Sequence, residues 1–150
     1  MDKLNRKFPL NTVLQRYWLP AIRAAIKLQE KNSVDAIELL QASVPHELGV
    51  PGPLQLGTMF PVYLRGEAYL AARQGNQAAA EFRKIIDHRG IVVNFPLGAL
   101  VHLQLGRALA LAGNENQAKA AYQDFLTLWK DADPDIPIFI AAKAEYAKLH

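Results

Sequence analysis

The sequence contains no cysteine, so disulfides, thiolate nucleophiles and cysteine metal sites are excluded. It has no apolar run close to the roughly 18 residues that span a bilayer, and no signal-peptide-like segment follows Met1. It has no block of five or more like charges, and its net charge is only +3, a poor electrostatic footprint for nucleic acid. We therefore expect a soluble segment with no membrane contact, and these absences leave its compartment unknown.

Motifs of catalysis are also missing. The glycines Gly49, Gly52 and Gly57 are not followed by the Gly-Lys-Ser/Thr of a phosphate loop, and no serine stands in a nucleophile elbow. The histidines are not spaced as a ligand set; they are His46, His88, His102 and His150. We expect His102 to hold a packed or half-exposed core position, and we predict no catalytic residue and no cofactor-binding residue.

The acidic loop at Asp131, Asp133 and Asp135 has the first positions of a calcium-binding loop. Such a loop needs glycine at position 6 and glutamate at position 12, but Ile136 and Ala142 stand there. We therefore predict no metal site, and we expect Asp135 to cap the following helix.

What the sequence does contain is a pattern that occurs twice between Met59 and Lys130. Gly66 and Gly106 lie 40 residues apart, as do Ala78 and Ala118, and Phe82 and Tyr122. A fixed period with matching internal offsets predicts a helical repeat array. A glycine kept inside both helices predicts a tight helix crossing, which we expect to face the small residues Ala78 and Ala118.

The glycine, the aromatic or leucine three residues later, and the alanine followed by an aromatic resemble the tetratricopeptide repeat. The copies depart from that pattern at Val62 and His102, where tryptophan is usual, and at Arg65, where leucine is usual. The period also exceeds the family's length of about 34 residues. The resemblance implies an all-α right-handed superhelix of antiparallel helix pairs.

These offsets divide a single domain, residues 1–150, into repeats. Repeat 1 is degenerate at 17–42, repeat 2 covers 59–88, repeat 3 covers 96–130, and a capping helix covers 136–149. A Pro/Gly-rich linker joins the first two repeats between Ser43 and Thr58. Prolines suit first helical turns, so we expect helices to begin near these residues: Pro20, with a kink or restart, Pro61, Pro96 and Pro137.

Local signals also predict the helix ends. We expect Ser33 to cap the second helix of repeat 1. We expect Gly75-Asn76 and Gly113-Asn114 to end the first helices of repeats 2 and 3, because these residue types tolerate the left-handed conformation.

A closer resemblance links nearly the whole chain to the C-terminal repeat region of bacterial serine/threonine protein kinases and related winged-helix regulators. It is carried by Phe8-Pro9, by the stretch from Tyr17 to Ala24, by that from Tyr63 to Leu70, and by that from Phe125 to Lys130. The resemblance implies a non-catalytic regulatory or scaffolding module of a signalling protein that binds a protein or peptide. The kinase motifs themselves are absent from the sequence.

Helical phase predicts a partner groove on the first helix of each pair. Its residues are Trp18, Ala21, Ala25, Phe60, Tyr63, Glu67, Leu103 and Arg107. The family's lysine and asparagine clamp for a terminal carboxylate is absent from these positions. Two alternatives remain at the groove: Glu67 and Arg107 pair with each other, or Tyr63 belongs to the core. Two alternatives remain for the function: a self-assembly domain, or less favoured a nucleic-acid-binding helical repeat.

Overall fold

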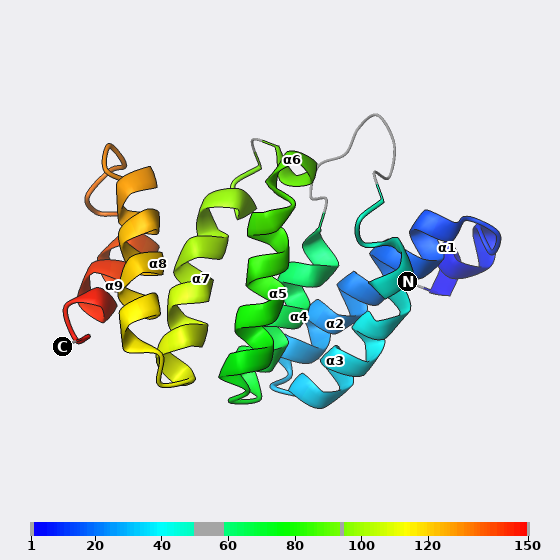
Figure 1. Cartoon of the computed structure of the whole chain (residues 1–150). Coiled ribbons are helices and arrows are strands. Elements are labelled where there is room, and N and C mark those ends of the chain that lie inside the picture. The colour runs from blue at the N-terminus through cyan, green and yellow to red at the C-terminus, as the bar shows by residue number, and fades with distance from the viewer. Residues whose placement is uncertain (1, 50–58, 94, 150) are drawn as a thin grey trace.

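The computed structural model describes residues 2–49, 59–93 and 95–149, and within these ranges the chain is helical with no strand. The all-α prediction is therefore confirmed. The α-helices, drawn in Figure 1, are α1 (Asp2–Lys7), α2 (Leu19–Gln29), α3 (Ser33–Leu40), α4 (Phe60–Ala71), α5 (Gly75–Asp87), α6 (Arg89–Val92), α7 (Leu97–Leu111), α8 (Glu115–Leu128) and α9 (Pro137–Tyr146). A π-helical turn (Leu14–Trp18) precedes α2, and a 3₁₀-helix (Gln41–His46) follows α3.

The long helices stand side by side in chain order, from α2 and α3 at the right of Figure 1 to α9 at the left. Each packs on the next, with α3 against α4, α5 against α7 and α8 against α9. In addition α2 contacts α4, and α4 contacts α7. The first helices of the pairs α2–α3, α4–α5 and α7–α8 therefore form one continuous layer.

The three pairs turn in the same way. Lys31, Arg73 and Gly113 each follow the first helix of a pair and have positive φ values of 59°, 61° and 78°. Each time, the next residue donates its backbone N–H to a carbonyl five residues back, as from Gln74 to Tyr69 at 2.8 Å. This is the Schellman ending, in which a left-handed residue lets the last carbonyls find partners.

The expectation for Gly75 is therefore wrong, although that for Gly113 is right. Arg73, and not Gly75, ends the helix in the second pair. Gly75 instead begins α5, where an added Cβ would lie 2.7 Å from the carbonyl oxygen of Ala108. Its small size serves the close approach of α5 to α7.

Proline marks the helix starts as predicted. Pro20, Pro61 and Pro137 stand in the first turns of α2, α4 and α9, and Pro96 is the N-cap of α7. Before Pro20 the helix widens, since the N–H of Leu19 bonds the carbonyl of Leu14. Proline lacks the donor that a regular α-helix would need there, which explains why the helix is irregular where a kink or restart was predicted.

Two predicted caps are wrong. The side chain that caps α3 is Asn32, whose Oδ1 accepts from the N–H of Asp35 at 3.1 Å, and not Ser33. Helix α9 has Ile136 at its N-cap and no side-chain cap bond from Asp135. With Pro137 at the first helical position, one of the N–H groups that would lack a partner there does not exist.

The pairs α4–α5 and α7–α8 share one internal geometry, a glycine against an aromatic ring. A Cβ on Gly66 would lie 2.5 Å from the Phe82 ring, and one on Gly106 would lie 2.7 Å from the Tyr122 ring. The atoms nearest to each glycine belong to these rings and not to Ala78 or Ala118, as the sequence had suggested. The crossing is tight because a flat ring lies over the glycine.

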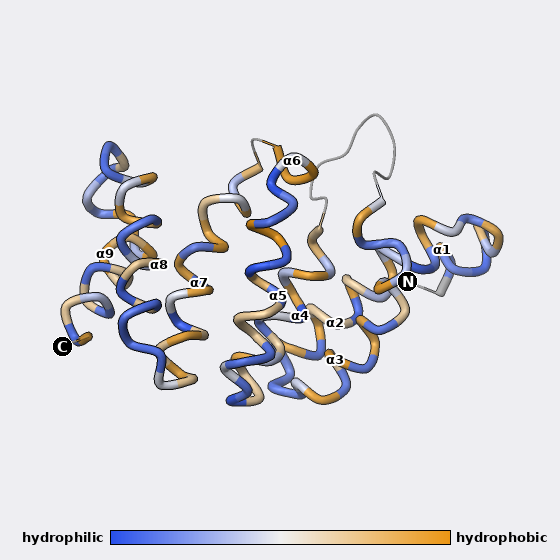
Figure 2. The backbone as a smooth tube through the Cα atoms, in the orientation of Figure 1, coloured by the Kyte–Doolittle hydropathy of each residue, from blue (hydrophilic) through white to orange (hydrophobic). Residues whose placement is uncertain are grey.

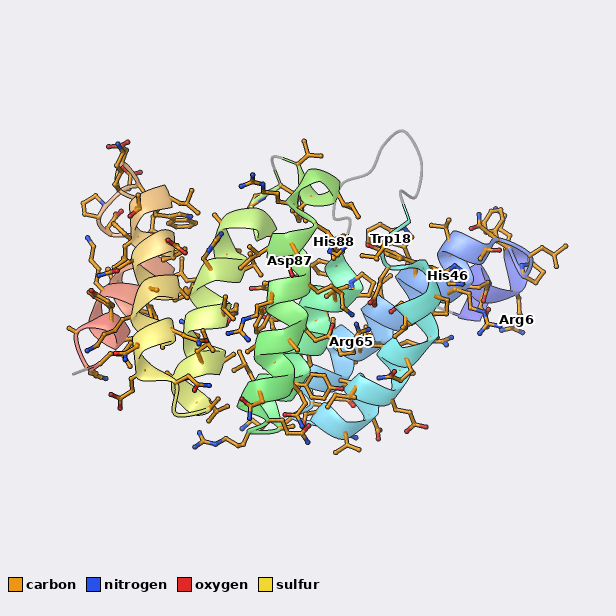
Figure 3. The ribbon with its side chains drawn as sticks, in the orientation of Figure 1. Arg6, Trp18, His46, Arg65, Asp87 and His88 are labelled. Atoms are coloured by element: carbon orange, nitrogen blue, oxygen red, sulfur yellow. The ribbon has the colours of Figure 1, made fainter. Side chains whose placement is uncertain are left out.

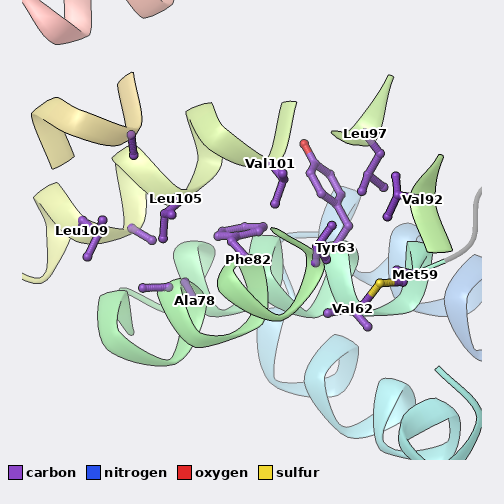
Figure 4. Close-up of a cluster of buried hydrophobic side chains, with 14 of the residues drawn as sticks. Met59, Val62, Tyr63, Ala78, Phe82, Val92, Leu97, Val101, Leu105 and Leu109 are labelled. Atoms are coloured by element: carbon purple, nitrogen blue, oxygen red, sulfur yellow. The ribbon is translucent and has the colours of Figure 1, made fainter. Parts of the chain in front are cut away.

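Buried apolar side chains join one pair to the next. Figure 4 shows the largest cluster, in which Phe82 of α5 lies among Tyr63 of α4 and Val101 and Leu105 of α7. Phe82 has no exposed surface, and its ring meets that of Tyr63 edge to face at a centroid distance of 5.8 Å. At the C-terminal end, Phe139 of α9 packs with Tyr122 and Phe125.

Apolar and polar residues alternate in bands along the helices, as Figure 2 shows. Among the described residues, no helix combines the length and apolarity that a membrane crossing requires.

Candidate interaction surface

The predicted groove residues separate into buried and half-buried sets. Leu103 and Ala21 have no exposed surface, and Tyr63 is 9% exposed. These residues are core, so the continuous apolar strip that helical phase suggested does not exist. Leu103 is covered because it packs in one cluster with Phe139 and Ala142 of α9. The half-buried set is Trp18, Ala25, Phe60, Glu67 and Arg107.

Tyr63, Glu67 and Gln104 form one polar contact between α4 and α7. The Nε2 of Gln104 donates to the Tyr63 hydroxyl at 3.1 Å and to Oε1 of Glu67 at 3.1 Å. The predicted alternative that Tyr63 belongs to the core is therefore correct for its ring. Its hydroxyl still takes part in the polar contact.

Arg107 pairs with Glu145 of α9 and not with Glu67. Its Nε and one terminal nitrogen donate to the two carboxylate oxygens of Glu145 at 2.8 and 2.7 Å, a bidentate geometry. The Tyr122 hydroxyl adds a third hydrogen bond to Glu145 at 2.8 Å. Another nitrogen of Arg107 reaches Oε1 of Gln104 at 3.3 Å, which joins the two groups. The alternative of a Glu67–Arg107 pair is wrong, because α9 supplies the carboxylate.

The carboxylates of Glu67 and Glu145 have opposite electrostatic environments. Burial raises the pKa of Glu67, and the Tyr63 hydroxyl and the charge of Arg107 only partly oppose it. Burial also favours a higher pKa for Glu145, but the hydrogen bonds from Arg107 and Tyr122 outweigh burial, so the pKa of Glu145 is lowered. Burial raises the pKa of Tyr63 to about 12. Glu67 is thus a desolvated carboxylate, and within the described ranges it has no ion-pair partner.

We define the inner surface as the half-buried residues Phe60, Glu67 and Leu70 of α4 with Arg107 of α7. Sequence reasoning missed two residues that organise it, Gln104 and Glu145. A signal was present for Gln104, a polar residue between Leu103 and Leu105 in an apolar helix. No signal indicated Glu145, because its role depends on how α9 docks.

A second polar cluster lies on the other side of α4 and centres on Arg65, labelled in Figure 3. Its guanidinium, 2% exposed, donates to Glu47 at 2.9 Å, to Glu81 at 2.6 Å and to the carbonyl of Leu40 at 3.4 Å. Lys84 adds a 2.7 Å bond to the second oxygen of Glu47. Two cations meet two carboxylates, so the buried charges balance.

His102, which stands where the repeat pattern has tryptophan, lies 3.6 Å from a carboxylate oxygen of Asp124. Burial lowers its pKa, and the nearby carboxylate opposes this only partly. A half-buried imidazole fits the packed or half-exposed core position that the sequence predicted. No group of three or more His, Asp or Glu in the described part of the chain is placed to hold a metal ion.

Comparison with known proteins gives no family, relative or fold neighbour: no family model, no curated protein and no solved structure matches the chain.

Proposed function

We propose that this chain is a non-catalytic protein–protein interaction module of tetratricopeptide type, a right-handed superhelix that binds a protein or peptide on its inner surface. The observation that supports the proposal most is the threefold recurrence of one turn, at Lys31, Arg73 and Gly113. Repeat arrays are built from successive helix pairs of equivalent geometry, and such arrays offer an extended surface to partners.

The composition of the inner surface also supports binding. Phe60 and Leu70 are apolar and partly exposed, and Glu67 and Arg107 add one charge of each sign. Aromatic and arginine side chains are the types that dominate binding energy at interfaces. The resemblance of the sequence to kinase-associated repeat regions leads us to propose a regulatory role within a larger bacterial signalling protein.

The test is capture of partners from the source cell with the chain as bait. The binding variant combines Glu67→Ala with Leu70→Ala on α4. The matched control combines Asn76→Ala with Gln77→Ala, both exposed on α5. We expect the first variant to lose partners that the control retains, while both melt within a few degrees of the original. Equal capture by the two variants would place binding elsewhere.

A further inference from the structure

In the stack of helix pairs, the pair α4–α5 turns one face toward α2–α3, the pair before it. On α4 this face carries Leu64 and Ala68, two residues before and two after Gly66. They are 5% and 0% exposed, and they pack in one cluster with buried residues of α2 and α3. This is how the array stacks its second pair on its first.

Ile22 and Ile26 hold the same two positions on α2. They lie two residues before and two after Ala24, which occupies the place of Gly66. The two isoleucines are 43% and 39% exposed. The register that buries Leu64 and Ala68 under helices thus leaves Ile22 and Ile26 in solvent.

The exposed apolar surface continues toward the N-terminus. Trp18 lies one helical turn before Ile22. It lines an open hollow of about 460 Å³ together with Leu4, Phe8, Asn11, Val13 and Leu14. Phe8 and Val13 are 43% and 38% exposed. We call Phe8, Val13, Trp18, Ile22 and Ile26 the end surface.

The chain segment that carries the end surface is basic. From Lys3 to Gln29 the sequence has no acidic residue and six cations, more than the whole chain's net charge of +3. Lys27 is neutralised by Glu30 at 2.8 Å. Lys3, Arg16 and Arg23 make no ion pair with any residue in the described ranges. The charge therefore remains available to a partner.

We propose that the end surface binds an amphipathic helix of a partner protein whose apolar stripe is flanked by acidic residues. A helix is the element that this register packs against in the second pair. Acidic flanks complement the cations, whereas a second copy docked through the same surface would oppose like charges. This site is separate from the inner surface and does not depend on its function.

The test uses two synthetic helical peptides of about five turns, with the same leucine stripe and either glutamate or lysine on the flanks. Binding of the labelled peptides to the whole chain is measured by fluorescence anisotropy at low and moderate salt. We expect the glutamate peptide to bind, and to bind more weakly as salt screens the charges. We expect no binding of the lysine peptide.

Variants assign the binding to the end surface. The variants Ile22→Asp and Ile26→Asp change exposed side chains, so both should fold. Each should weaken binding of the glutamate peptide by about tenfold or more. The control Val34→Asp changes a residue of α3 that is 70% exposed, and it should leave binding unchanged. Glu67→Gln on the inner surface should also leave peptide binding unchanged, which separates this proposal from the first.

Three results would overturn the proposal. The first is equal binding of both peptides, or binding that neither isoleucine variant weakens. The second is a concentration-dependent dimer, seen by light scattering and abolished by Ile22→Asp, which would make a second copy the occupant. The third is Ile22-dependent binding to phosphatidylglycerol vesicles without binding of the glutamate peptide, which would make the occupant an anionic lipid surface.

Discussion

The helix pairs α4–α5 and α7–α8 share one backbone plan but place their charges on opposite sides. Both set a glycine under an aromatic ring, and both end the first helix with a left-handed residue. In α4–α5 the cation is Arg65, just before the glycine, and it is buried among carboxylates. In α7–α8 it is Arg107, just after the glycine, and it lies 29% exposed on the inner surface. A shift of two positions on a helix turns a side chain to nearly the opposite side, here from the joint between pairs to the inner surface.

The largest loss of stability should come from giving α4 the residue that α7 has just before its glycine. Arg65→Leu, which copies Leu105, leaves Glu81 and one oxygen of Glu47 without their buried counter-ion. Removing one partner of a buried pair costs about 3–5 kcal/mol, and we expect the lower end because Lys84 still holds Glu47. The free energy of unfolding in urea measures the loss.

Arg107→Leu is the matched control for this change. Its pair with Glu145 is about one-third exposed, so we expect a loss of about 1 kcal/mol or less. Equal losses at the two arginines would contradict the contrast between a buried and an open cluster.

The next largest effect concerns the feature that α4–α5 and α7–α8 share, a glycine under an aromatic ring. Gly66→Ala and Gly106→Ala each place a Cβ within 2.7 Å of an aromatic ring or closer. Each should cost about 1–3 kcal/mol through overpacking, measured by thermal or urea unfolding. Gly90→Ala in α6 meets no atom within 4 Å and serves as the control, which should be neutral or slightly stabilising. A loss at Gly66 no larger than at Gly90 would mean that the ring simply moves aside.

The turn that ends the first helix of a pair allows two reciprocal substitutions, which should change stability in opposite directions. Arg73 and Gly113 hold the same left-handed place, and no atom lies within 4 Å of a Cβ added to Gly113. Arg73→Gly should stabilise by about 0.5–1 kcal/mol, and Gly113→Ala should destabilise by about 1 kcal/mol. Melting temperatures that move in the same direction for both variants would exclude this explanation.

The sequence predicted the features that depend on local pattern. Helical class, the helix-start prolines and the glycine crossings follow from spacing and from backbone chemistry that acts within a few residues. The alternative caps were not predictable in the same way, because Asn32 and Ser33 are both good caps and stand side by side. Side-chain partners across the array depended on how far each helix rotates and slides when it docks.

Arg65 and Glu145 illustrate that limit. An arginine where the repeat pattern has leucine was visible in the sequence, but its carboxylates come from Glu47 and Glu81, which are 18 and 16 residues away. Glu145 lies 38 residues from Arg107, on a helix that the sequence predicted only as an apolar cap. Spacing alone cannot find pairs that form between different helices.

The smallest effect distinguishes by pH the carboxylate of Glu67, on the inner surface, from that of Glu145, which pairs with Arg107. The pKa of Glu145 is lowered in the folded chain, so its contribution to stability is present above the unfolded pKa and is lost as pH falls through the folded pKa. Glu145→Gln should therefore be most destabilising near neutral pH, and its difference from the original chain should shrink in acid. The pKa of Glu67 is raised, so ionisation there opposes folding, and the cost grows as pH rises through the unfolded pKa. Glu67→Gln should then be neutral or slightly stabilising at pH 7 and lose that advantage in acid. Urea unfolding of the three proteins across this pH range measures both differences. If Glu67→Gln is instead as destabilising as Glu145→Gln at neutral pH, Glu67 is held as a satisfied structural carboxylate, and its part in the inner surface is no longer supported.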